Sequence, residues 1–233
     1  MSNFKIYNLF PLSIYRSKID LENSEKDKLK NLILNMEKKS QNKDYKSINK
    51  SWTGDTQGYE SLHYDNNFTK LFEIIGIHIK SYLESLNIDL KKIDIFFQRS
   101  WPTISRGAEN ISPHIHAQSH ISFAYYLRKS KDDAKIIFLD QNKNNEIIPG
   151  LFSSKSVIKE KILKKRDEIN TSAITFDVNE NDIVIFPSKT LHSTQANVKN
   201  NERISLSADV TILAKNSKNL EHLTPAFENW KKI

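Results

Sequence analysis

A change of residue pattern near residue 92 constrains the fold of this sequence more than any other feature. From there to residue 212 the chain runs in short segments rich in β-branched and aromatic residues, separated by Asn, Gly, Lys and Pro. We predict a strand in each of "KIDIFFQRSW", "HISFAYYLR", "AKIIFL", "AITFDV", "DIVIFP", "LHSTQA" and "RISLSADVTI". This many short strands in succession favour a closed or sandwich-like antiparallel sheet.

The part of the chain before residue 92 has helical periodicity instead. Apolar residues recur every three or four positions over 21–39 and again over 66–88, which predicts two amphipathic helices. A strand is expected earlier, in "YNLFPLSIYRSKI", where Pro11 indicates the edge of a sheet. The sequence therefore predicts an α+β fold.

Length favours one domain, because 233 residues suit a single sizeable core. We expect residues 1–90 to supply helical support and a loop, residues 91–213 to form the β core, and residues 214–233 to be a C-terminal extension within one domain spanning 1–233.

Composition limits the partners and the metal chemistry. The net charge is +7, but the excess lysines are scattered and form no basic tract interleaved with aromatics, so we do not expect nucleic-acid binding. No apolar stretch reaches the roughly 18 residues of a membrane span, and we expect a cytoplasmic protein that does not contact membranes. Without cysteine, a metal would be held by nitrogen and oxygen ligands.

Histidines are concentrated in "SPHIHAQSHISFAYYLR", at His114, His116 and His120. If this stretch is a strand, side-chain alternation points His114 and His116 the same way, so that both reach one ion. His192 follows the strand "DIVIFP" and can complete a three-histidine site. Three protein ligands would leave coordination positions open, as oxygen chemistry requires.

A second pair of polar residues lies in the last predicted strand. Arg203 and Ser205 alternate onto one face of "RISLSADV", where a guanidinium and a hydroxyl can hold a carboxylate. A solvent-facing arginine on an edge strand is the simpler alternative.

These elements, in this order, resemble the iron(II)- and 2-oxoglutarate-dependent oxygenases, and within them a microbial and phage group of 2OG-Fe(II) oxygenases. The resemblance covers about residues 95–213 and is carried by "HIH", "YYL", "FPS", the later histidine and "RIS". It implies a double-stranded β-helix (jelly roll), an iron(II) cofactor, 2-oxoglutarate and O2 as cosubstrates, and hydroxylation of a small-molecule or peptide substrate. By motif, His114 and His192 take two iron positions, and Arg203, Ser205 and Tyr126 take the 2-oxoglutarate positions.

His116 departs from the family pattern, which has Asp or Glu at this place. The His-x-His spacing favours ligation by His116, giving a three-histidine metal site of His114, His116 and His192; the alternative is that His116 stands aside and water or substrate fills the gap. His120 is left as a group near the site or an ordinary core or surface histidine.

Two other functions fit the same residues. A cupin-type metal enzyme would use three or four histidines without 2-oxoglutarate, with His120 as the fourth. A non-catalytic metal-containing protein would use the barrel for binding alone. We expect substrate selectivity to come from the loop "SWTGDTQGYESLHYD" and from the insertion at 140–170, while the sequence leaves the substrate and the oligomeric state open.

Overall fold

The computed structural model describes residues 5–40, 50–131, 135–196 and 201–233. Its helices are α1 (Asn23–Ser40), α2 (Thr69–Ser85) and α3 (Lys155–Lys159), with 3₁₀ turns η1 (Gly54–Thr56), η2 (Leu62–Tyr64), η3 (Leu90–Lys92) and η4 (Phe227–Asn229). Its strands are β1 (Tyr15–Lys18), β2 (Trp52–Thr53), β3 (Ile93–Arg106), β4 (Ile121–Arg128), β5 (Ile136–Leu139), β6 (Ala173–Phe176), β7 (Asp182–Pro187), β8 (His192–Thr194) and β9 (Glu202–Ala214).

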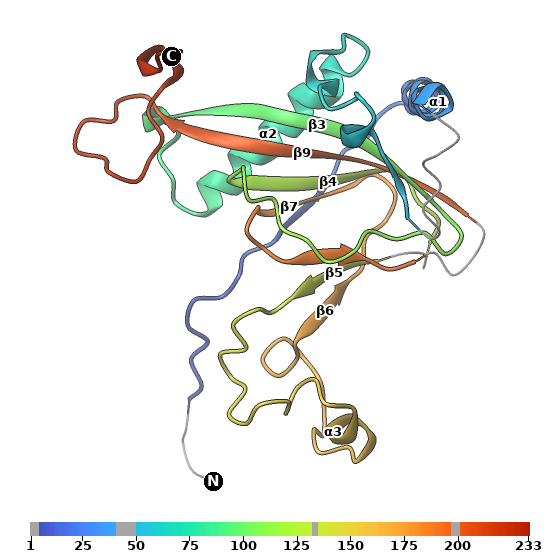
Figure 1. Cartoon of the computed structure of the whole chain (residues 1–233), viewed down its shortest axis with the longest axis vertical. Helices are drawn as coiled ribbons and strands as arrows, with labels where there is room; N and C mark the ends of the chain where they lie inside the picture. The colour runs from blue at the N-terminus through green and yellow to red at the C-terminus, as the bar shows by residue number, and fades with distance from the viewer. Residues whose placement is uncertain (1–4, 41–49, 132–134, 197–200) are drawn as a thin grey trace.

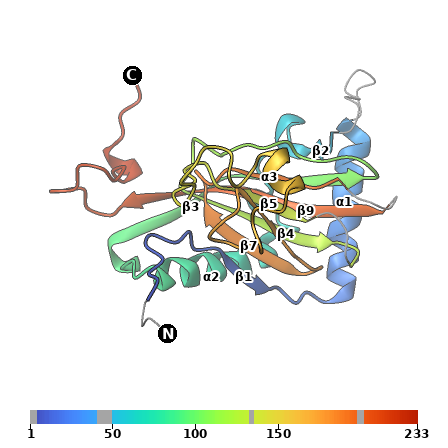
Figure 2. The same cartoon turned by 90° about the horizontal axis from the view of Figure 1, so that it is seen from below.

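The strands form a large and a small sheet, and every pairing within them is antiparallel. The large sheet has the order β1-β7-β4-β9-β3-β2, and the small sheet has the order β6-β5-β8. Figure 1 shows the small sheet below the large one, with α3 at the far end. In Figure 2 β5 and α3 lie in front of strands of the large sheet. The predicted α+β class is thus confirmed.

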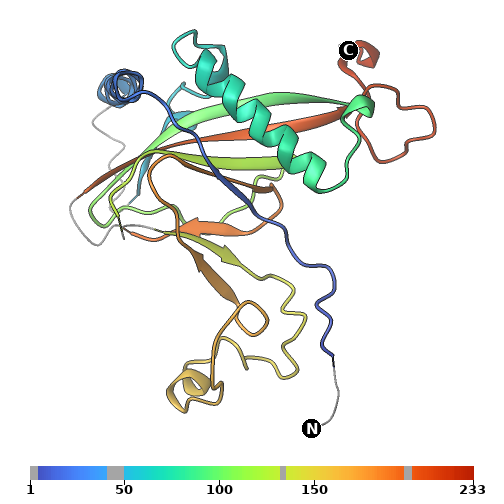
Figure 3. The same cartoon turned by 180° about the vertical axis from the view of Figure 1, so that it is seen from behind.

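The main core lies between the large sheet and the two long helices. Figure 3 shows α2 crossing the outer face of this sheet. Strand β9 turns its even-numbered apolar side chains, from Ile204 to Val210, toward the helices, where they join one buried cluster with Ile33, Ile75 and Ile79. Full burial of each such aliphatic side chain stabilises the fold by about 2 kcal/mol. This packing fixes which face of β9 looks inward.

The inward faces of the long strands carry polar side chains. In β9 the odd-numbered residues Arg203, Ser205 and Ser207 line a cavity between the sheets. Strand β3 also directs polar side chains toward the cavity, because its register shifts between Phe97 and Arg99. A bulge moves the following residues to the opposite face, because side chains alternate along a strand.

The consequence of the bulge is visible in the packing of β3. Before it, Ile93, Ile95 and Phe97 pack in the helix-side core. After it, Ile104 occupies that side while Arg99 and Trp101 face the cavity.

Two local predictions differ from the structure. The expected strand at residues 7–19 is reduced to β1 at the sheet edge, and the residues before it, such as Phe10, are exposed in irregular backbone. Pro11 accounts for this, because proline gives no backbone donor to a sheet. The predicted strand through His114 and His116 is irregular apart from one bridge at His114.

No helix among the described residues combines the length and apolar character needed to cross a bilayer.

Candidate metal and cosubstrate site

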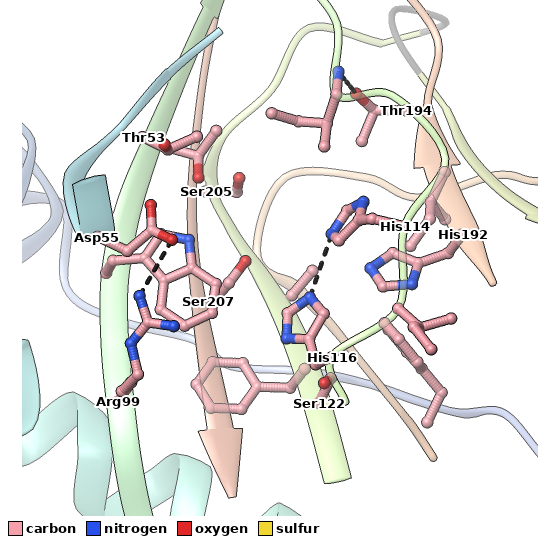
Figure 4. A pocket seen from close by; sticks show the side chains of 18 of the residues that line it. Thr53, Asp55, Arg99, His114, His116, Ser122, His192, Thr194, Ser205 and Ser207 are labelled. Carbon is pink, nitrogen blue, oxygen red and sulfur yellow. Dashed lines mark hydrogen bonds and ion pairs between the residues drawn. The ribbon is translucent and has the colours of Figure 1, made fainter. Parts of the chain in front are cut away.

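One cavity of about 330 Å³ opens between the two sheets. Figure 4 shows three histidines on one side of it and Asp55 with Arg99 on the other. Its lining brings together the sequence-predicted residues His114, His116, His192, Arg203, Ser205 and Tyr126. Residues far apart in the chain, from β4, β8, β9 and the loop after β3, therefore meet at one site.

The histidines are positioned by backbone hydrogen bonds rather than by a common strand. The amide of His114 donates to the carbonyl of His192 (2.9 Å), and the amide of His192 donates back to His114 (3.0 Å). The amide of His116 donates to the carbonyl of Ser188 (3.0 Å), in the turn that follows β7. The prediction that the two residues share a strand face is wrong, yet their rings converge because the loop is anchored at both positions.

The ring nitrogens of the three histidines form a ligand set. One nitrogen of each lies within 4.8 Å of the other two. The Nε2 atoms of His114 and His116 are 3.1 Å apart. Two nitrogens on adjacent octahedral positions, each about 2.1 Å from a metal, are separated by about 3 Å. The spacing therefore suits a first-row metal ion.

The other ring nitrogen of each histidine has an acceptor. The Nδ1–H groups of His114 and His192 donate to the carbonyls of Ser112 and Thr190, both at 2.9 Å. Since a carbonyl can only accept, Nδ1 carries the proton and Nε2 keeps its lone pair. Metal-binding histidines are usually oriented by such a bond from the second ring nitrogen. The residues present fit a metal ion.

Burial keeps two of these rings neutral. It lowers the pKa of His114, and it lowers the pKa of His192 to about 3. Neutral imidazole is the form that binds metals. Both rings are thus in the ligating form at neutral pH.

His116 has a carboxylate as its acceptor instead of a carbonyl. Its Nδ1–H donates to Oδ1 of Asp209 at 2.5 Å, and Asp209 is fully buried. Gln118 and Ser119 also donate to this carboxylate, at 2.7 and 3.2 Å. Burial works to raise the pKa of Asp209, but the hydrogen bond and charge of His116 lower it overall. Asp209 is one of the residues at the site that the sequence analysis did not identify.

The predicted cosubstrate residues lie on the β9 and β4 walls. Arg203 and Ser205 are 3% and 7% exposed, so the alternative of a solvent-facing arginine is wrong. Arg203 Nη2 donates to the hydroxyls of Ser105 (2.8 Å) and Thr194 (3.3 Å). Tyr126 is buried on the adjacent strand, and burial raises its pKa to about 12, so it stays a neutral phenol. A guanidinium and two hydroxyl groups therefore face one end of the cavity.

The loop after β2 supplies the opposite side of the cavity. Asp55 accepts from Arg99 at 3.2 Å, and the Arg99 guanidinium lies 5.3 Å from the ring centroid of Trp101. Gly54 lets this loop approach β3, because a Cβ there would lie 2.6 Å from the Pro102 ring. The expected selectivity loop thus reaches the cavity.

The structure also decides between the alternatives for His120 and places the insertion relative to the cavity. His120 lies outside the metal cluster found among the described residues, and its Nδ1 accepts from the exposed backbone amide of Ile212 (2.9 Å). The four-histidine cupin arrangement is therefore not formed. The described part of the insertion at 140–170 contributes no residue to the cavity wall, contrary to its expected role over the barrel mouth.

The sequence of this core matches a known family. Residues 99–209 match the family model described as "Putative 2OG-Fe(II) oxygenase". Residues 99–209 are thus similar in sequence to the 2OG-Fe(II) oxygenases. The description of this family names iron(II) and 2-oxoglutarate, and the three histidines could hold the metal, which favours an enzyme over the non-catalytic alternative.

Solved structures agree with the predicted double-stranded β-helix. The non-heme alpha ketoglutarate dependent epimerase SnoN from nogalamycin biosynthesis is 12% identical, with a TM-score of 0.53 over 88% of this chain and 82% of its own. A Pseudomonas putida prolyl-4-hydroxylase is 10% identical, with a TM-score of 0.51 over 86% and 92%. HygX from Streptomyces hygroscopicus, solved with nickel and 2-oxoglutarate bound, is 8% identical, with a TM-score of 0.51 over 86% and 83%. At these identities the likeness concerns the fold, and no curated protein matches the chain.

Proposed function

We propose that this oxygenase hydroxylates an unactivated C–H bond of a small-molecule, amino-acid or peptide substrate. One oxygen atom of O2 would enter the substrate as a hydroxyl group, and the other would enter succinate as 2-oxoglutarate loses CO2. The observation that carries the proposal is the convergence of three anchored imidazoles and a buried arginine on one cavity.

In this proposal His114, His116 and His192 hold the iron. Their Nε2 lone pairs face one another while their Nδ1–H groups are occupied. Bound iron(II) would supply the redox chemistry that activates O2. Hydrogen bonds of the protein orient the three rings independently of the metal. The coordination positions left open on the iron would therefore point in fixed directions.

Arg203, Ser205 and Tyr126 are assigned to 2-oxoglutarate. The guanidinium would pair with the carboxylate remote from the metal, and the two hydroxyl groups offer further hydrogen bonds. Burial of Arg203 strengthens this pairing, because a charge of opposite sign is attracted more strongly away from water. The hydroxyls of Ser105 and Thr194 hold the guanidinium in place.

The substrate would enter beside Asp55 and Arg99, which line the cavity opposite the three histidines (Figure 4). The cavity is at the small end of the range for ligand sites. This size favours a compact molecule, or one side chain of a larger one, beside the cosubstrate.

The test uses iron(II) and 2-oxoglutarate with the full chain. Anaerobic mixing should produce the weak visible charge-transfer band of the 2-oxoglutarate chelate, and admitting O2 should convert 2-oxoglutarate to succinate even without substrate. His114→Ala and His192→Ala should abolish both signals. Arg203→Leu should abolish them at moderate 2-oxoglutarate concentrations and leave metal binding intact.

His120→Ala is the matched control, since it removes a histidine from the same stretch outside the metal cluster. It should behave as the unmodified protein. A protein that binds iron(II) but never gives the band or succinate would overturn the proposal.

A further inference from the structure

The third histidine raises a question of charge that the proposed function leaves open. The usual facial triad contains one carboxylate, which offsets part of the charge of iron(II). Three imidazoles that bind iron as neutral ligands would bring no negative charge. A site of this kind is more cationic by one unit unless another group compensates.

Asp209 is placed to compensate. It is fully buried, and its Oδ1 accepts the Nδ1–H of His116 at 2.5 Å. No other histidine of the cluster has a carboxylate acceptor among the contacts of the described residues, because His114 and His192 donate to backbone carbonyls. The carboxylate of Asp209 therefore contacts His116, the residue at the position where the family has Asp or Glu.

The surroundings of the pair hold it in a single geometry. Trp101 stacks on the ring of His116, with centroids 5.7 Å apart and planes at 27°. Gln118 and Ser119 donate to the same carboxylate as His116. Both the ring face and its Nδ1 edge are thus fixed.

A nearby cation does not cancel this charge. Arg99 approaches Oδ2 of Asp209 at 3.6 Å, but it also pairs with Asp55 at 3.2 Å. Two carboxylates share one guanidinium, so this group of three keeps a net charge of −1 when both acids are ionised.

We propose that Asp209 replaces the missing triad carboxylate from behind His116. In this role, which rests on the proposed function, Asp209 is a positioning residue: it fixes the proton on Nδ1, directs Nε2 to the metal and returns one negative charge to the site. Carboxylate–histidine–metal relays of this type make the ring a stronger ligand.

The test measures Co(II) affinity by the visible absorption of the bound ion, without 2-oxoglutarate or turnover. Asp209→Asn keeps the side-chain volume and an acceptor for His116 but removes the charge. It should weaken Co(II) binding by about 10- to 100-fold. The matched control is Asp182→Asn, because Asp182 is also buried and paired with an arginine, Arg16, but its hydrogen bonds go to Arg16 and the Asn179 amide and not to a histidine of the cluster. It should change the affinity by less than twofold.

A double-mutant cycle separates action through His116 from a general structural effect. In a His116→Ala background, Asp209→Asn should weaken Co(II) binding by less than threefold further. An equal loss in both backgrounds, or an unchanged affinity in the single variant, would overturn the inference. Loss of binding in His114→Ala and His192→Ala checks the proposed function itself; if those variants bind Co(II) normally, the metal site is elsewhere and the proposed function fails first.

A second measurement needs no change at Asp209, in case that variant does not fold. Nitrogen-15 spectra of the histidine rings in the metal-free protein should show His116 protonated at Nδ1 and bare at Nε2, with the signal assigned from His116→Gln. A ring protonated at Nε2 alone would contradict the inference.

Discussion

The two walls of the cavity are built in different ways. The β9 wall is a continuous strand of 13 residues whose inward row, Arg203, Ser205, Ser207 and Asp209, follows strict alternation. The histidine wall consists of a loop and the three-residue strand β8, joined by one bridge between His114 and His192. A regular strand sets its side chains by periodicity, whereas the loop sets them by individual hydrogen bonds. Damage to the two walls should therefore have different consequences.

The largest expected effect comes from the charged end of the β9 wall. Arg203→Leu should raise the KM for 2-oxoglutarate by roughly 100-fold or more, because a buried charge pair is lost. Co(II) affinity without 2-oxoglutarate should stay within twofold, since the histidine wall is unchanged. Steady-state succinate formation and Co(II) titration measure the two quantities. An unchanged KM would mean that the cosubstrate binds elsewhere, and Arg203→Lys, which keeps the charge, should lose less.

A smaller effect is expected on the histidine wall when the pH falls. The pKa of His192 is about 3 in the folded chain and about 6.5 when unfolded. Below pH 6.5 His192 binds a proton in the unfolded chain but stays neutral in the folded chain until the pH approaches 3. The contribution of His192 to the free energy of unfolding is therefore complete above pH 6.5 and is lost progressively as the pH falls toward 3. Between pH 7 and 5 the loss from this ring is about 2 kcal/mol.

Urea unfolding of the metal-free protein at both pH values measures this loss. His192→Asn should reduce the pH dependence by the same amount, and His120→Asn serves as the comparison that retains it. A pH dependence identical in all three proteins would show that burial of His192 does not control it.

The smallest effect concerns the contact that joins the walls. Thr194 accepts from Arg203 of the β9 wall and from the amide of Ile111 in the histidine loop (2.9 Å). Thr194→Val keeps the shape but removes the hydroxyl that accepts both hydrogen bonds, and should cost about 1 kcal/mol of unfolding free energy. Thermal unfolding and the KM for 2-oxoglutarate measure it. A loss in stability without any change in KM would place the role of Thr194 in the loop alone.

The same contrast explains what could be predicted from the sequence. Period-2 alternation placed Arg203 and Ser205 on one inward face, and two more steps of it reach Asp209, so the signal for this residue was present. The role of Asp209 could not be inferred, because the function of an aspartate in an apolar strand depends on the group that it contacts. His116 lies 93 residues away in sequence, and only the folded chain brings the two together.

Other features had no readable signal. The bulge between Phe97 and Arg99 reverses the faces of β3, and nothing in "FFQRSW" marks it. Trp101 and Arg99 therefore entered the cavity unpredicted. The histidine pair was expected to share a strand, whereas hydrogen bonds to His192 and Ser188 place it, and such bonds cannot be read from spacing.

The reciprocal backbone bonds between His114 and His192 have a thermodynamic consequence. Two of the three proposed metal ligands are brought together by folding itself, so an arriving ion would not have to order the chain to assemble them. Little of the free energy of metal binding would then be used to order the chain. The metal-free and metal-bound proteins should have nearly the same hydrodynamic radius and circular dichroism spectra.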